Sequence, residues 1–180
     1  MFKPRHEVLA VMVLAAALTR LIPHPPNMTS IGALALFGGA QFSDKRAAFL
    51  VPFAALLLSD LFLGLYTYMV VVYSSFALIV CIGLWLQRRR NPWRIAGASL
   101  AGSVLFFVIT NFGVWAVGST YPKDLSGLLA CYTAAIPFFR NTLLGDGLYT
   151  LVLFGGFALL EKRFEILRQT EIPSPGTAGR

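Results

Sequence analysis

Long apolar runs, separated by short polar segments, dominate the chain. The runs occupy residues 7–22, 31–42, 47–65, 68–87, 94–117 and 141–161. A helix that crosses a bilayer needs about 20 apolar residues, and fewer suffice where protein shields its ends. Most of the runs approach this length, whereas the second is short and rich in glycine. The pattern predicts an all-α fold, an integral membrane bundle of six transmembrane helices.

Two further segments complete the predicted organisation. Residues 125–139 are apolar but interrupted by polar groups and by Pro137, so we expect a loop with a short helix that dips toward the membrane. The chain ends in "EIPSPGTAGR", a polar tail rich in proline and glycine. We therefore expect a transmembrane helical domain over residues 1–168 and a disordered polar tail over 169–180.

Composition supports lipid as the solvent of the runs. Of the 180 residues, 57% are hydrophobic and only 13% are charged, against about 25% charged in a soluble domain. The mean hydropathy is +0.70. A chain of this length forms one domain and still exposes about a third of its unfolded surface. A surface that is this apolar is stable only in contact with lipid, so we expect the lipid bilayer as a partner.

The distribution of basic residues predicts the orientation. The net charge is +7, but Lys and Arg stand in short clusters between the apolar runs, which excludes a nucleic-acid partner. With the N-terminus inside, only Arg20, Lys123 and Arg140 of the 15 Lys and Arg fall outside. The positive-inside rule therefore favours six spans with both termini cytoplasmic.

A cleaved signal peptide is the competing interpretation of the first run. Residues 1–17 have a basic start, an apolar middle and an "AAA" segment where cleavage is conceivable. Cleavage would leave five spans and would separate the segment around His24 from its anchor.

Hydrophilic side chains from distant runs fall at one depth in this topology. They are Arg20, His24, Asn27, Asp60, Asn111, Arg140, Asn141 and Asp146. Each lies in the outer half of the membrane, where a charged group normally faces a partner or a water-filled cavity. These residues are the candidate substrate-binding residues. The arginines would hold anionic groups and the aspartates would accept hydrogen bonds.

The segment "RLIPHPPNMTSIGAL", residues 20–34, carries three of these side chains. Its three prolines cannot continue a helix. Irregular backbone at membrane depth requires protein or water to satisfy it. We expect a fixed, non-helical cap beside a cavity, with Thr29 or Ser30 as the N-cap of the next helix.

The same side chains have structural explanations. Arg20 with Asp60, or Arg140 with Asp146, would also serve as ion pairs that orient helices. Small residues at the spacing of Ala35 with Gly39, and of Gly97 with Ala101, indicate close helix packing within the chain or a docking face for a partner.

Catalytic and metal-binding motifs are not found in the sequence. It contains no GxxxxGK[ST], HExxH or GxSxG motif. A single histidine near the polar layer makes a poor metal site, and Cys81 and Cys131 are 50 residues apart within apolar runs. We expect free buried cysteines, no catalytic residues, no metal, no cofactor and no enzyme activity.

Four segments carry a resemblance that covers residues 18–163. They are "RLIPHPPNMTSIGALALFGGAQF", "LLLSDLFLGLY", "FFVITNFGVWAVGSTYP" and "LLACYTAAIPFFRNTLLGDGLYTLVLFGGFALLE". They resemble a family of small bacterial integral membrane proteins of unknown function, whose members are usually described as transport proteins. The resemblance implies a multi-pass protein of the bacterial cytoplasmic (inner) membrane.

A fainter similarity is to the substrate-binding subunits of energy-coupling-factor vitamin transporters, which are six-span bundles with a vitamin site near the outer face. The solitary cobalamin-transporting relatives also place a histidine after the first span, an aspartate in the third and an arginine before the last. Their cobalt-binding cysteine has no counterpart here, and Ala10 followed by Leu14 departs from the alanine-xxx-alanine docking motif.

Two functions from different classes follow. The first is a transport protein that binds a small solute, vitamin-like or another metabolite, in an outward-facing pocket. It would work with an energising membrane module or alone. The second is a non-transporting structural or accessory subunit of a larger membrane complex.

Overall fold

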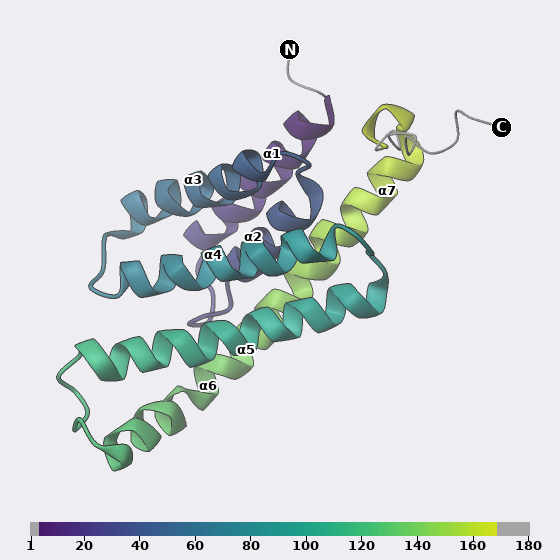
Figure 1. Ribbon diagram of the computed structural model, residues 1–180. Coiled ribbons are helices and arrows are strands. Elements are labelled where there is room, and N and C mark those ends of the chain that lie inside the picture. Colours follow the sequence, from purple (N-terminus) through teal and green to yellow (C-terminus); the bar gives the residue numbers. More distant parts are fainter. Residues whose placement is uncertain (1–3, 169–180) are drawn as a thin grey trace.

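The computed structural model describes residues 4–168, and these form helices and connecting loops without a strand (Figure 1). The helices are α1 (Pro4–Leu18), α2 (Ile31–Gln41), α3 (Lys45–Leu63), α4 (Met69–Leu86), α5 (Pro92–Val117), α6 (Leu125–Thr150) and α7 (Gly156–Arg163). A 3₁₀ turn, η1 (Thr19–Leu21), extends α1, and a second one, η3 (Glu165–Leu167), follows α7. The predicted all-α fold is therefore confirmed. The tail predicted over residues 169–180 lies outside the described residues.

Four helical segments are long and apolar enough to cross a membrane: Lys45–Leu63, Met69–Leu86, Pro92–Val117 and Leu125–Arg163. Helices of this length and composition are typical of a membrane protein. α1, with 15 residues, and α2, with 11, are shorter than a full span.

The last of these segments corrects the expected loop at residues 125–139. α6 begins there and continues through the π-helical segment η2 (Leu151–Gly155) into α7, giving one helix of 39 residues. The Asp124 carboxylate starts the helix by accepting the Gly127 N–H. Contacts with α5 then hold the first half of α6, since the Tyr132 hydroxyl donates to the Val108 carbonyl. These contacts outweigh the one hydrogen bond that Pro137 removes.

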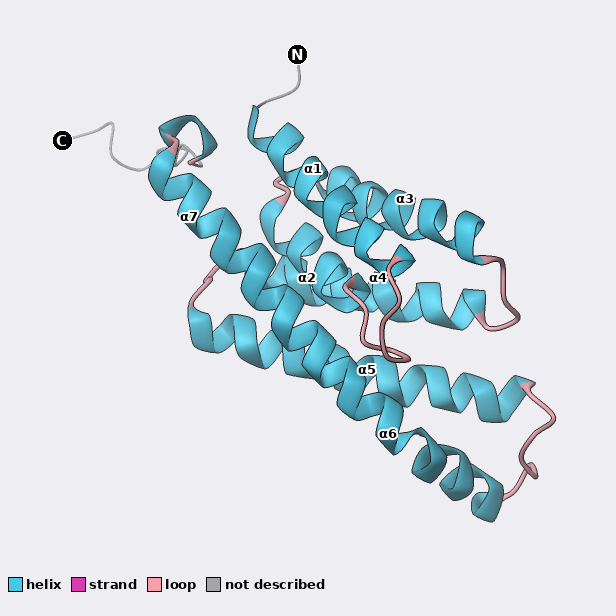
Figure 2. Cartoon of the chain, turned by 180° about the vertical axis from the view of Figure 1, so that it is seen from behind, coloured by secondary structure: helices cyan, strands magenta, loops and turns pink. Residues whose placement is uncertain are grey.

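α2 forms the centre of the bundle (Figure 2). All of its residues except Gly32 are buried. It packs most closely on α4, where a β-carbon at Gly39 would stand 2.3 Å from the Val80 carbonyl oxygen. The predicted small-residue contact of Ala35 and Gly39 is thus packing within the chain, whereas Gly97 and Ala101 on α5 are exposed.

The helices run alternately up and down, so α1 begins at the end of the bundle where α7 finishes (Figure 1). The Arg5 side chain joins these two ends through an ion pair of 2.5 Å with Glu161. Most of the Lys and Arg side chains lie at this end, which we call the basic end. The opposite end, which carries the loops 22–30, 64–68 and 118–124, is the far end.

Candidate functional site

Two adjoining cavities lie in the far half of the bundle. The inner cavity, of about 220 Å³, borders the first turn of α2 at Ile31 and Gly32. The outer cavity, also of about 220 Å³, continues toward the far end along α5 and the first half of α6. Five residues line both cavities: Asn27, Tyr66, Val72, Phe106 and Thr142. The two cavities therefore adjoin, the inner one toward the core and the outer one toward the far end.

An arginine–aspartate pair forms one side of the inner cavity. The Arg20 guanidinium donates to Asp60 Oδ1 at 2.7 Å and to the Ser59 hydroxyl at 2.5 Å. The Tyr73 hydroxyl donates to Asp60 Oδ2 at 2.9 Å, and Tyr66 reaches the same oxygen at 3.5 Å. Burial and then the Asp60 charge raise the pKa of Tyr66 to about 12, so its phenol remains a donor. Asp60, which is completely buried, is thus fully compensated.

A second acid, Asp146 on α6, forms the opposite side. It is 5% exposed. Its Oδ2 accepts the Ser103 hydroxyl of α5 at 2.6 Å, and the backbone N–H of Ala33 also donates to the carboxyl group. Only a glycine at position 32 allows this approach, because a β-carbon there would stand 2.3 Å from Asp146 Oδ1. Within residues 4–168, no Lys, Arg or His forms an ion pair with Asp146.

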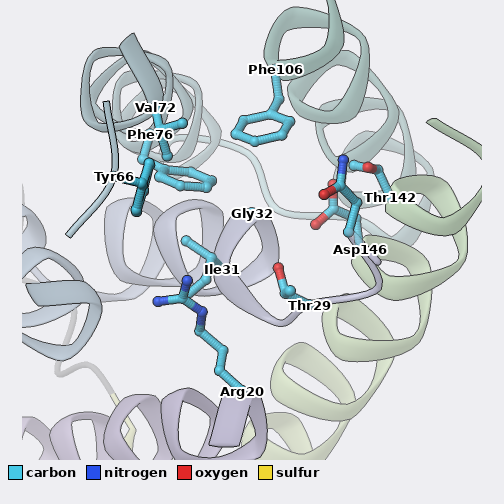
Figure 3. Close-up of a pocket in the computed structure, with 11 residues that line it drawn as sticks. Arg20, Thr29, Ile31, Gly32, Tyr66, Val72, Phe76, Phe106, Thr142 and Asp146 are labelled. Atoms are coloured by element: carbon cyan, nitrogen blue, oxygen red, sulfur yellow. The ribbon is translucent and has the colours of Figure 1, made fainter. Parts of the chain in front are cut away.

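Aromatic rings complete the walls (Figure 3). Phe76 of α4 and Phe106 of α5 stack with their centroids 5.1 Å apart. Tyr66 lies on the same side as Phe76, across the cavity from Thr142 and Asp146. The cavity therefore combines apolar ring faces with a few polar groups, as small-molecule sites do.

The proline-rich segment forms the non-helical structure expected of it. The Met28 N–H donates to the Pro25 carbonyl at 3.0 Å, and Asn27 has a φ of 63°. Proline followed by a residue with positive φ is typical of a type II turn. The Asn141 side chain donates to the Pro26 carbonyl at 2.9 Å and so attaches the turn to α6.

The predicted N-cap of α2 is confirmed in its position, but the hydrogen bond expected from its side chain does not form. Ser30 occupies the N-cap, but its side chain makes no cap hydrogen bond. Its hydroxyl donates instead to the Ala16 carbonyl at 2.7 Å, which ties the start of α2 to α1. Thr29 lines the inner cavity.

The structure brings together only part of the predicted polar set. Arg20, Asn27 and Asp146 line the inner cavity, and Asn111 lines the outer one. Asp60 supports Arg20 from behind, and Asn141 positions the turn. His24 and Arg140 are exposed and line neither cavity.

The alternative pairing of Arg140 with Asp146 does not form. Six residues along an α-helix leave two side chains about 120° apart around the axis, so these side chains point to different faces. The alternative pairing of Arg20 with Asp60 does form.

Sequence reasoning did not select five of the residues that build the site: Thr29, Gly32, Phe76, Ser103 and Phe106. Thr142, also not selected, stands one turn before Asp146 on α6, and this i, i+4 spacing was a usable signal. The others became relevant only through contacts between helices.

The two cysteines differ in environment. Cys131 is buried and its thiol donates to the Asn111 carbonyl at 3.5 Å, whereas Cys81 is exposed, contrary to expectation. In the described part of the chain, no three His, Cys, Asp or Glu side chains come together as metal ligands would.

Comparison with known proteins identifies the family. The model of a family of unknown function (DUF6580) matches residues 1–170, so the chain belongs to this family. No curated protein and no solved structure matches the chain. Membership of an uncharacterised family, expected from the histidine–proline segment and its companions, is thereby confirmed.

Proposed function

We propose that this protein is a membrane transport protein that captures a small solute in the inner and outer cavities. The observation that carries the proposal is the meeting of Arg20, Thr29 and Asp146 around one cavity. Three separate elements supply these side chains: η1, the 22–30 loop and α6. Ionisable groups in a membrane are costly, and those that face a cavity commonly mark a solute pathway.

We propose six membrane crossings with both termini on the cytoplasmic side of a bacterial inner membrane. The basic end carries most of the Lys and Arg side chains, as cytoplasmic surfaces of membrane proteins do. α2 spans only about 16 Å. The irregular segment 22–30 would complete the crossing that α2 begins. This segment lines a cavity, and water in the cavity can bond its free backbone groups. The cavities would then face the outside.

Release of the solute requires an opening at the basic end. There the Arg5 side chain bonds Gln41 at 2.9 Å and Glu161 at 2.5 Å, and Gln87 bonds the Gly39 and Phe42 carbonyls. Opening these contacts demands either an energising membrane module or a rocking motion of the bundle. The chain itself performs no chemical step in this mechanism.

A second candidate function is an accessory subunit of a larger membrane complex. It is favoured by the exposed small residues Gly97 and Ala101 on α5, which permit close approach of another helix. Under this hypothesis the inner cavity would bind no ligand. A substitution that fills the cavity would then leave the function of the protein unchanged.

The test is thermal unfolding of the purified protein in lipid nanodiscs against a panel of vitamins and metabolites. A ligand at 100 times its Kd adds about 2.7 kcal/mol to stability, which a melting experiment resolves. Thr142→Leu, which puts a bulkier apolar side chain into the wall of both cavities, should reduce the shift. The matched control Thr133→Leu, on the exposed face of α6, should retain it.

Two outcomes would favour the accessory subunit instead. One is a panel in which no compound raises the melting temperature of the wild-type protein. The other is a wild-type protein that moves no compound of the panel across the bilayer after reconstitution in liposomes.

A further inference from the structure

The charges around the inner cavity do not balance. Arg20 and Asp60 cancel each other across 2.7 Å. Asp146 has only neutral donors, the Ser103 hydroxyl at 2.6 Å and the Ala33 N–H. A buried carboxylate without a counter-ion is expensive unless a charged partner arrives. The cavity wall therefore presents one buried carboxyl group that pairs with no Lys, Arg or His of residues 4–168.

The remaining groups that face Asp146 supply no second positive charge. Across the cavity stand Arg20, already paired, and Tyr66, a phenol that donates to Asp60. α2 presents Gly32 and Ala33 to the carboxyl group, and α5 presents Ser103. The other cation on α6, Arg140, is exposed and outside both cavities.

The aromatic wall favours the same kind of ligand. Phe76 and Phe106 line the cavity as a stacked pair, with an interplanar angle of 22°. The negative face of an aromatic ring attracts a cation, most strongly where water is excluded. Ring faces also pack well on the flat body of a cyclic molecule. A volume of about 220 Å³ restricts the occupant to a small one.

We infer that the solute is a small organic cation, an amine or nitrogen heterocycle with a compact apolar or aromatic body. Its charged nitrogen lies at Asp146, and its body lies against Phe76 and Phe106. This inference rests on the proposed function, because it names the class of solute that the same cavities take.

The test compares ligands that share a ring and differ in charge. Benzyltrimethylammonium, benzyl alcohol and benzoate are titrated against the wild-type protein in nanodiscs by isothermal calorimetry. The cation should bind at least tenfold more tightly than the alcohol, and benzoate more weakly than either. Asp146→Asn should remove the preference for the cation. Asp124→Asn, the same change on an exposed carboxylate at the far end, should leave it intact.

A second variant keeps the inference testable if Asp146→Asn fails to fold. Phe106→Leu removes a ring face and keeps the Asp146 carboxyl group. It should therefore weaken binding of the cation more than binding of the alcohol. Equal binding of all three probes, or tighter binding of benzoate, would overturn the cation class while leaving the proposed function standing. Absence of binding by any probe, together with an inert metabolite panel, would overturn both.

Discussion

The two halves of α2 have opposite surroundings. In the half toward the basic end, Gly39 packs on the backbone of Gly83. Gln41 accepts hydrogen bonds from Arg5 at 2.9 Å and from Arg90. In the half toward the far end, Ile31 and Gly32 border a cavity. The same helix is thus sealed at one end and open at the other.

The difference shows that charged side chains among apolar helices do not by themselves make a site. At the basic end Arg5 and Arg90 both bond the Gln41 side chain, and the backbones of α2 and α4 are in contact at Gly39 and Gly83, which leaves no cavity between these two helices there. At the far end, Asp146 meets only small neutral donors and borders open space. An acidic side chain that lacks an ion-pair partner and lines a cavity is therefore the better indicator of a binding site.

The largest effect is expected from Arg20→Gln. This change leaves Asp60 buried without its counter-ion, and removal of one partner of a buried ion pair costs about 3–5 kcal/mol. Unfolding in denaturant, followed by circular dichroism, would measure the loss. Arg140→Gln is the matched control, because this arginine at the same end is exposed, and it should change stability little. Equal losses in the two variants would contradict the distinction between paired and unpaired groups at the far end.

The second-largest effect is expected from Arg5→Met, which should lower the free energy of unfolding by about 2–4 kcal/mol. Arg5 is buried and joins Glu161 to Gln41, but its partner carboxylate retains 29% of its exposure and can be solvated. The melting temperature should fall while ligand binding at the far end persists. Arg168→Met removes an exposed pair with Glu165 at 3.5 Å and should cost less than about 1 kcal/mol. A binding defect in Arg5→Met would show that the two ends are not independent.

Gly39→Ala tests the close packing that seals the basic half of α2. A β-carbon there would stand 2.9 Å from Gly83 Cα, and overpacking of this kind costs about 1–3 kcal/mol. Gly97→Ala is its control, because nothing lies within 4 Å of that position, and it should be neutral or slightly stabilising. Thermal unfolding of both variants gives the comparison. A neutral Gly39→Ala would mean that α2 and α4 are not held in contact.

The smallest effect concerns Asp124, the exposed carboxylate that caps α6 at the far end. The Gly127 N–H and the Ser126 hydroxyl lower its pKa by bonding the charged form. A lowered folded-state pKa gives stability that is present above the ordinary carboxyl pKa and is lost as pH falls through the folded value. The melting temperature should therefore drop slightly more below about pH 4 in wild type than in Asp124→Asn. Identical acid profiles would indicate that the cap contributes nothing.

Prediction from sequence succeeded where the determinant is local. The apolar runs located α3, α4 and α5 within a few residues, because helix formation and membrane burial depend on neighbouring residues. The non-helical structure of the 22–30 segment also followed from its prolines. The loop expected at residues 125–139 was wrong, because tertiary contacts with α5 override the local influence of Pro137.

Prediction of the site was partial for a related reason. Depth along each helix placed Arg20, Asp60 and Asp146 in one layer, and the structure brings Arg20 and Asp146 to one cavity. Depth does not give the direction in which a side chain points around the helix. His24 and Arg140 share the layer and face away from the cavity.

The sequence by itself determined a helical membrane protein, the clustering of its basic residues and the polar layer, because hydropathy and charge act residue by residue. Only the tertiary structure decided that Arg20 neutralises Asp60 while Asp146 meets a neutral donor, the Ser103 hydroxyl. It also decided that α2 packs tightly on α4 at Gly39 and borders a cavity at Ile31 and Gly32. Pairing and empty volume both depend on how helices rotate and pack against one another, and no single segment of the chain contains that information.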